Sequence, residues 1–130
     1  MMTIPELQII ETPGGEISYR ENGSGPILLL MHGIGGNSRS WRSQLDKLSN
    51  NFRVIAWDAP AYGKSAERGA NLEEYTKAVI EFLDALSVAT VNLLGHSMGG
   101  VVAQGVAGFH PDRVKKLVLS STFMGHGSAE

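Results

Sequence analysis

The chain of 130 residues contains no cysteine, which excludes disulfide bonds, thiolate metal sites and cysteine nucleophiles. It also lacks an excess of basic charge, because 11 Lys and Arg stand against 13 Asp and Glu for a formal net charge of −2. No strongly basic face is therefore available for nucleic acid or for an anionic membrane surface, and we expect neither as a partner.

Long hydrophobic runs are missing as well. The apolar run at 27–31 is far shorter than the ~20 residues that cross a bilayer. The segment at 1–6 has no basic stretch followed by an apolar one, so it does not read as a secretory signal. These absences lead us to expect a cytoplasmic protein.

Glycine is abundant, with 16 residues of 130, and it shows no Gly-X-Y period that would indicate collagen. The hydrophobic fraction of 42% and the charged fraction of 18% are those of a globular chain. By length alone the chain would be one small domain. The glycines are then expected in turns and where backbones approach closely.

Strand and helix patterns alternate along the chain. A hairpin is predicted at 7–20 around Pro13-Gly14-Gly15. Apolar runs typical of strands buried on both faces follow, at 27–31, 52–57, 91–94 and 114–120. Helical patterns lie between them, at 41–48, after the N-cap Asn71, and at 98–109. This order predicts a doubly wound α/β fold with a mostly parallel sheet of about six strands and three helices.

Two helices carry more specific predictions. Glu74 stands at the third position of the helix that follows Asn71, as in a capping box. The helix at 98–109 is nearly all apolar or small, and we expect it to be buried on most sides.

A serine turn carries the strongest chemical signal. Gly95-x-Ser97-x-Gly99 follows an apolar strand and opens a small-residue helix, which is the setting of a nucleophile elbow. A serine on so sharp a turn is strained, and side chains two residues away on either side would collide, so Gly95 and Gly99 fit the pattern. The alternative is an ordinary tight turn with a capping serine.

A glycine-rich turn, His32-Gly33-Ile34-Gly35-Gly36, follows the first apolar strand. Acyl transfer needs two N–H donors for the developing oxyanion, and we expect the backbone amides of Ile34 and Met98 to supply them. A phosphate-binding loop is the alternative, but the Lys-Ser/Thr ending and a G-x-G-x-x-G match are absent. His32 could act as a base, although a supporting hydrogen-bonding role fits its place better.

Asp58 follows the second apolar strand, in the stretch Asp58-x-Pro60-x-x-Gly63-x-Ser65. It could be an acid or a metal ligand, but no histidine or carboxylate lies near it at ligand spacing. We therefore expect Asp58 to brace the turns at this edge of the sheet. No metal and no cofactor is implied.

His32-Gly33, the Asp58-to-Ser65 stretch and Gly95-His96-Ser97-Met98-Gly99-Gly100 together resemble the α/β-hydrolase superfamily. Within it the chain is most similar to small bacterial esterases, enol-lactonases and meta-cleavage-product hydrolases. The resemblance implies a serine hydrolase in which Ser97 attacks a carboxylic ester, a lactone or an activated C–C ketone bond and forms an acyl-enzyme. The serine argues against relatives that use aspartate there, such as haloalkane dehalogenases and epoxide hydrolases.

Two other classes remain open. The chain could be a non-catalytic, ligand-binding member of the same fold, with Ser97 holding the ligand. A flavodoxin-like nucleotide binder would need a phosphate loop that the sequence does not contain.

The sequence departs from the family pattern at Ala61, where relatives usually carry glycine. A positive φ at this position would cost alanine about 1 kcal/mol, so the local turn is expected to differ if that cost is avoided.

The larger departure concerns the partners of Ser97. The resemblance implies the order nucleophile, acid, histidine, with the last two on later loops. After Ser97 only His110, Asp112, His126 and Glu130 can ionise in these roles. The first two lie at a helix end, on the edge of the sheet expected to be opposite Ser97, and a base at His126 would break the family order. Residues 1–130 are thus expected to be the N-terminal part of a single α/β-hydrolase domain, inactive alone.

Overall fold

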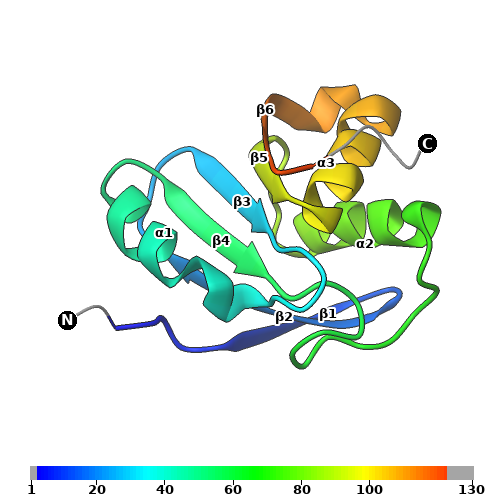
Figure 1. The fold of residues 1–130 in the computed structure, drawn as a ribbon, viewed down its shortest axis with the longest axis horizontal. Coiled ribbons are helices and arrows are strands. Elements are labelled where there is room, and N and C mark those ends of the chain that lie inside the picture. The colour runs from blue at the N-terminus through cyan, green and yellow to red at the C-terminus, as the bar shows by residue number, and fades with distance from the viewer. Residues whose placement is uncertain (1–2, 123–130) are drawn as a thin grey trace.

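A six-stranded sheet organises the molecule, and the computed structural model describes residues 3–122 of it (Figure 1). The strands are β1 (Gln8–Thr12), β2 (Gly15–Asn22), β3 (Ile27–Met31), β4 (Arg53–Trp57), β5 (Val91–His96) and β6 (Val114–Ser120). Their order in the sheet is β1-β2-β4-β3-β5-β6. The hairpin β1–β2 joins β4 antiparallel, and β4, β3, β5 and β6 are parallel to one another.

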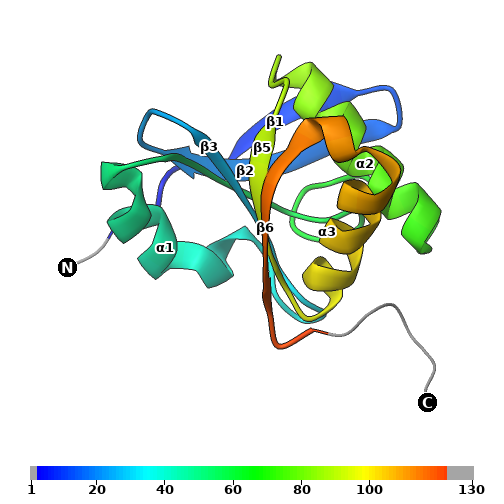
Figure 2. The ribbon, with the colours of Figure 1, turned by 90° about the horizontal axis from the view of Figure 1, so that it is seen from above.

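The helices cover both faces of this sheet. Helix α1 (Arg42–Lys47), with 3-10 turns on either side, lies on one face. Helices α2 (Leu72–Ala85) and α3 (Met98–Phe109) lie on the other, as Figure 2 shows. The predicted doubly wound, mostly parallel α/β sheet of six strands and three helices is confirmed.

Strand β3 shows why a continuous apolar run is needed in the middle of such a sheet. Leu29 and Met31 pack into the core beneath α2 and α3, whereas Leu28 and Leu30 pack beneath α1 with Leu45. Successive side chains of a strand point to opposite faces, so a strand covered by helices on both sides must be apolar at every position.

The start of α2 matches only half of the predicted capping box. The Asn71 side chain accepts a hydrogen bond from Glu74 N at 2.8 Å, as expected of an N-cap. The Glu74 carboxylate accepts from the Arg68 guanidinium, at 3.3 and 3.4 Å. Arg68 also pairs with Glu81 at 2.8 Å, so it ties the loop before α2 to the body of the helix.

The prediction that α3 is buried on most sides is only partly correct. One side is buried, through Gly99, Gly100, Val102, Ala103, Gly105 and Val106. The other side is partly open, and Phe109 at the end of the helix is 71% exposed. The apolar composition of α3 therefore exceeds what the described neighbours cover.

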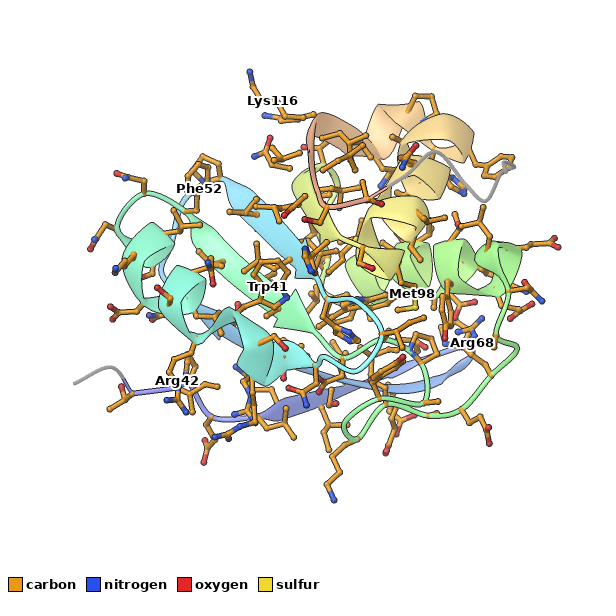
Figure 3. All side chains as sticks on the ribbon, viewed as in Figure 1. Trp41, Arg42, Phe52, Arg68, Met98 and Lys116 are labelled. Carbon is orange, nitrogen blue, oxygen red and sulfur yellow. The ribbon has the colours of Figure 1, made fainter. Side chains whose placement is uncertain are left out.

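Strand β6 forms one edge of the sheet and is exposed along most of its length. Leu117, Val118 and Leu119 keep 36%, 52% and 42% of their surface exposed. Lys116 extends away from the molecule, whereas Trp41 lies within it (Figure 3). An apolar edge strand with a free row of backbone groups is ready to pair with a further strand.

Candidate active site

Ser97 stands on the sharp turn between β5 and α3. Its backbone has φ 56° and ψ −119°, a strained conformation for a residue with a side chain. A Cβ on Gly95 would lie 2.4 Å from the Gly99 carbonyl oxygen, and one on Gly99 would lie 2.0 Å from the Met31 carbonyl oxygen. Glycine is therefore required at both positions. For Gly95 the reason is the predicted collision within the turn, whereas for Gly99 it is the close approach of β3.

The end of β6 holds this turn in place. Ser97 N donates to the Ser120 carbonyl oxygen at 3.0 Å, and the Thr122 hydroxyl donates to the Ser97 carbonyl oxygen at 2.8 Å. A Cβ on Gly100 would lie 2.3 Å from Thr122 Oγ1, so Gly100 allows this approach. The strained serine is thus bonded through both of its peptide groups to the segment that ends the edge strand.

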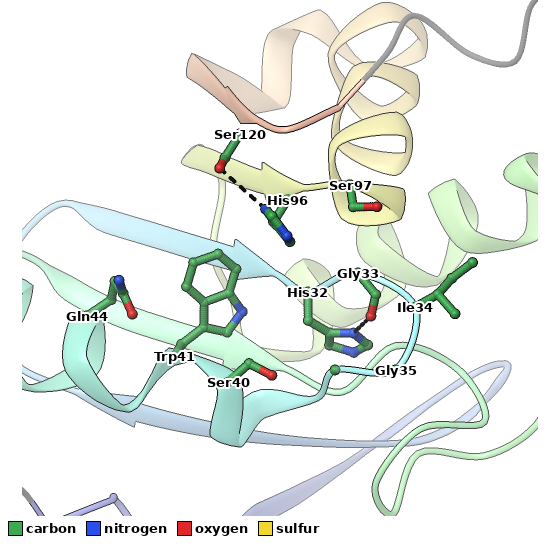
Figure 4. A pocket seen from close by; sticks show the side chains of 11 residues that line it. His32, Gly33, Ile34, Gly35, Ser40, Trp41, Gln44, His96, Ser97 and Ser120 are labelled. Atoms are coloured by element: carbon green, nitrogen blue, oxygen red, sulfur yellow. Dashed lines mark hydrogen bonds between the residues drawn. The ribbon is translucent and has the colours of Figure 1, made fainter.

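The glycine-rich turn after β3 lies against Ser97. A Cβ on Gly33 would lie 2.9 Å from the Ser97 Cβ. The Ile34 side chain is exposed, with 80% of the residue's surface free, and it turns away from the sheet (Figure 4). Met98 is the first residue of α3, where a backbone N–H has no partner within the helix. The structure thus brings the turn at 33–34 beside the serine and the start of α3.

His32 is buried, with 2% of its surface exposed, and both ring nitrogens are used. Ala59 N donates to Nε2 at 3.0 Å, so the proton sits on Nδ1, which donates to the Gly33 carbonyl oxygen at 2.8 Å. Burial lowers the pKa of His32 below its ordinary value, with a smaller opposing effect of the Gly33 hydrogen bond. A neutral ring with both nitrogens engaged joins the turns after β3 and β4.

Asp58 is the centre of a second network at the same edge of the sheet. Its carboxylate accepts from Ser18 Oγ at 2.5 Å and from Ser38 N at 2.6 Å, and its carbonyl oxygen accepts from Ser65 Oγ at 2.6 Å. Ser65 Oγ in turn accepts from Ser18 N at 2.9 Å. These contacts tie the turns after β3 and β4 to β2, in line with the bracing role that we expect for Asp58.

Ala61 adopts φ 73° in the turn after β4. The turn thus keeps the left-handed conformation that glycine would favour, and the exposed alanine is strained there. Ala61 therefore bears the cost of a positive φ rather than avoiding it.

A cleft of ≈ 480 Å³ opens beside Ser97. Its lining residues are His32, Gly33, Ile34, Gly35, Gly36, Ser40, Trp41, Gln44, His96, Ser97 and Ser120. One wall comes from the ends of β5 and β6, and the facing wall comes from the beginning of α1 and the turn before it (Figure 4). His96 lies in the first wall, exposed, with Nδ1 3.3 Å from Ser120 Oγ.

Sequence reasoning missed the α1 wall. Ser40, Trp41 and Gln44 line the cleft, whereas the sequence pattern indicated only a helix at 41–48. The signal that could have found them is position, because this helix directly follows the glycine-rich turn that borders Ser97.

The other ionisable candidates lie elsewhere. Asp112 lies near Ser87 and Thr90, at the amino end of β5, whereas Ser97 follows its carboxyl end. The six residues of β5, at about 3.3 Å each, separate the two ends by roughly 20 Å. His126 and Glu130 fall outside the described residues. Among residues 3–122, no hydrogen bond joins the Ser97 hydroxyl to an imidazole and no group of three or more acidic or histidine side chains could hold a metal.

None of the helices at 3–122 has the length and apolar content needed to cross a membrane.

Comparison with known proteins places this geometry in context. A model of the alpha/beta hydrolase fold matches residues 26–130. (E)-2-((N-methylformamido)methylene)succinate hydrolase of Acinetobacter baylyi is 36% identical over 103 residues, which cover 78% of this chain and 39% of that protein. Epoxide hydrolases also match.

Solved structures agree. The crystal structure of a hydrolase from Pseudomonas aeruginosa PA01 superimposes with a TM-score of 0.87 at 35% identity, over 94% of this chain and 48% of that one. The enol-lactonase from Burkholderia xenovorans LB400 gives a TM-score of 0.83 at 30% identity, over 88% of this chain and 46% of that one. The chain thus spans less than half the length of these relatives.

Proposed function

The chain belongs to the alpha/beta hydrolase fold family, and on that premise we propose that it is the part of a serine hydrolase that carries the nucleophile. Ser97 would attack the carbonyl carbon of a carboxylic ester, a lactone or an activated C–C ketone. The alcohol or carbon leaving group would depart, and water would release the acyl group from Ser97. Relatives whose names are enol-lactonase and succinate-derivative hydrolase support the hydrolytic reaction class.

The observation that carries the proposal is the strained turn of Ser97 against Gly33. A positive φ at a non-glycine residue is costly and persists where the surroundings impose it, which is typical of functional sites. The serine at this position argues against the aspartate chemistry of epoxide hydrolases, although those proteins match the chain.

The oxyanion would be held by the amides of Ile34 and Met98. The turn at 33–34 borders the serine, and Met98 begins α3, where the positive end of the helix dipole adds to the N–H group. His32 and Gly33 would support this arrangement, the first through its two hydrogen bonds and the second through its small size. Gly95 and Gly99 would keep the turn sharp, and His96 would form part of the cleft wall.

Fluorophosphonate labelling tests the nucleophile. We expect labelling at Ser97 in a full-length hydrolase that contains this sequence, and its loss in Ser97→Ala. Ser49→Ala is the matched control, because Ser49 lies in the 3-10 turn after α1, does not line the cleft, and its hydroxyl bonds only to Asp46 O among the described residues. Absence of labelling in a verified full-length protein would contradict the proposal.

We also propose that the chain is the N-terminal part of a single α/β-hydrolase domain whose acid and base lie on further segments. The share of its relatives that the chain covers supports this, as does the apolar edge of β6, which the described residues leave exposed. Residues 1–130 alone should then hydrolyse p-nitrophenyl acetate far more slowly than typical esterases, because an unassisted hydroxyl is a weak nucleophile. An esterase-like rate would refute this and would direct attention to His126.

A non-catalytic, ligand-binding role is the second candidate. It is favoured by one observation, the lack of a hydrogen bond from the Ser97 hydroxyl to a histidine among residues 3–122. A full-length protein that binds small carbonyl compounds in the cleft but resists fluorophosphonate would establish it.

A further inference from the structure

Helix α3 carries more apolar surface than its described neighbours cover, and its open end borders a groove beside α2. The groove has a volume of ≈ 650 Å³. One wall is an i, i+4, i+8 row of α2, and the end of α3 forms the other; these residues are Leu72, Thr76 and Ile80, and Phe109 and His110. The groove shares no lining residue with the cleft described above.

Close contact between the two helices at one point explains the shape of the groove. A Cβ on Gly105 would lie 2.7 Å from Thr76 Oγ1 and 3.1 Å from Leu72 Cδ1, so α3 touches α2 there. One turn later, Phe109 is 71% exposed and a Cβ on Gly108 would meet nothing within 4 Å, so α3 has left α2. An apolar hollow therefore lies next to an exposed aromatic ring, and contiguous apolar surface of this kind is typical of interaction sites.

The outer rim of the groove carries charges of both signs. Glu73, Lys77 and Glu81 form a second i, i+4 row of α2 beside the apolar one. The Glu81 carboxylate is already used, because it accepts from the Arg68 guanidinium at 2.8 Å and from Gly14 N at 3.0 Å. Glu73 and Lys77 are exposed, and neither forms an ion pair among residues 3–122. One anion and one cation, a helical turn apart, thus border the apolar hollow.

The groove lies away from the edge at which the sheet can grow. Helix α2 packs against β1, whereas α3 packs against β5 and β6 (Figure 1). A strand added beyond β6 would extend the sheet on the far side of α3, so it would leave the groove between α3 and α2 open. We therefore expect the groove to be filled by another molecule.

We propose that a second copy of the same protein occupies this surface, with the two α2 helices antiparallel across a twofold axis. Such an axis sets the same patch of the two copies against itself. With the axis at the level midway between Glu73 and Lys77, Glu73 of each copy faces Lys77 of the other, and the apolar surfaces around Phe109 face each other alongside. A purely acidic or purely basic partner would pair only one of these charges, whereas a second copy pairs both.

The test uses the full-length protein that contains this sequence, and sedimentation equilibrium measures the dissociation constant of the expected dimer. Phe109→Ala should weaken the dimer at least about tenfold, because an aromatic side chain within an interface carries much of the binding energy. At concentrations where the protein is monomeric, the same change should leave the urea midpoint unaltered, because Phe109 is exposed in the single copy. Ile9→Ala is the matched control, since Ile9 is also exposed but lies on β1, outside the groove, and should leave the dissociation constant unchanged.

Charge reversal tests the twofold arrangement. Lys77→Glu sets carboxylates of the two copies against each other, and the dimer should weaken about fivefold at low salt. The double variant Glu73→Lys/Lys77→Glu exchanges the two charges and should restore the dissociation constant of the parent protein. A surface that packs against itself predicts this recovery, whereas a different partner would keep its own charges and bind the double variant no better.

A protein that remains monomeric at about 100 µM would overturn the inference. So would a dimer that Phe109→Ala leaves intact, or a double charge variant as weak as Lys77→Glu. A lower urea midpoint of monomeric Phe109→Ala would also overturn it, because the protein's own chain would then cover the groove. The inference does not rest on the proposed function, so Ser97→Ala should dimerise like the parent protein, and loss of hydrolysis and loss of the dimer are separate results.

Discussion

The two halves of the sheet, around β2 and β4 and around β6, differ in how many hydrogen bonds tie them to neighbouring turns and helices. On the β2–β4 side, the turns after β3 and β4 are joined by His32 and Asp58, and the hairpin is tied to α2, since Gly14 N donates to Glu81 Oε1 at 3.0 Å. On the β6 side, apolar side chains and a strand edge remain exposed among the described residues. One wall of the cleft is thus supported by bonds within the described residues, whereas the wall that holds Ser97 is bonded to the end of an exposed edge strand.

Removing the Asp58 carboxylate should have the largest effect, because it takes away the hydrogen bonds that distinguish the β2–β4 half. Asp58→Ala leaves the Ser38 N–H and the Ser18 hydroxyl without their buried acceptor, and we expect a loss of about 2–4 kcal/mol in the free energy of unfolding. Urea unfolding measures it. Asp58→Asn keeps the shape and one acceptor oxygen, so its loss should be smaller, and equal losses in both variants would contradict the network.

A matched pair of valines compares the two sides directly. Val54 is fully buried in β4, and Val118 is 52% exposed on β6. Val54→Thr should lower the free energy of unfolding by about 1–3 kcal/mol, because a hydroxyl is buried without a partner. Val118→Thr should change it by less than about 0.5 kcal/mol. Similar losses at both positions would show that β6 is covered in solution, by a second copy or by residues beyond 122.

Low pH should reduce the free energy of unfolding, because it favours protonation of His32 in the β2–β4 half. Its pKa is lowered in the folded state, so the unfolded chain binds more protons as the pH falls below the ordinary value of 6.5. The contribution of the neutral His32 ring to stability is complete above pH 6.5 and declines as the pH falls toward the pKa of the folded state. Unfolding free energies on both sides of pH 6.5 measure the slope. In His32→Gln this slope should flatten, and an unchanged slope would assign the effect to other groups.

The smallest expected effect is an increase in stability. Ala61 is exposed and has φ 73°, so Ala61→Gly should raise the free energy of unfolding by roughly 0.5–1 kcal/mol. Thermal unfolding is sensitive enough to detect it. Ala70→Gly is the control, because Ala70 is also exposed in a loop but its φ is not positive, and glycine should lower stability there. A loss in both variants would mean that the turn at Ala61 is not strained.

The elements that could be predicted from sequence are those with local signals. The run Ile27–Met31 gave β3 with its bounds, and Asn71 gave the start of α2, because burial on two faces and capping each leave a pattern within a few residues. The serine turn is only partly local. A Cβ on Gly95 would clash with Gly99 of the same turn, whereas a Cβ on Gly99 would clash with Met31 at the end of β3, which only the fold brings near.

What could not be predicted depends on distant partners. Asp58 bonds to Ser18 and Ser38, which come from different elements 40 and 20 residues away. Glu74 completed no capping box because Arg68, held also by Glu81, competes for its carboxylate. The groove between α2 and α3 follows from where the fold places the two helices, and no spacing in the sequence reveals it.

The bonds from Ser97 to Ser120 and Thr122 connect the cleft directly to the end of β6. Whatever covers β6 and whatever occupies the cleft both act on the position of the same two peptide groups. Linkage is reciprocal, so a molecule that binds more tightly when β6 is covered must, by the same factor, strengthen that covering. Any pairing along β6 that changes the affinity of the cleft for a ligand is therefore changed by that ligand to the same extent and in the same direction.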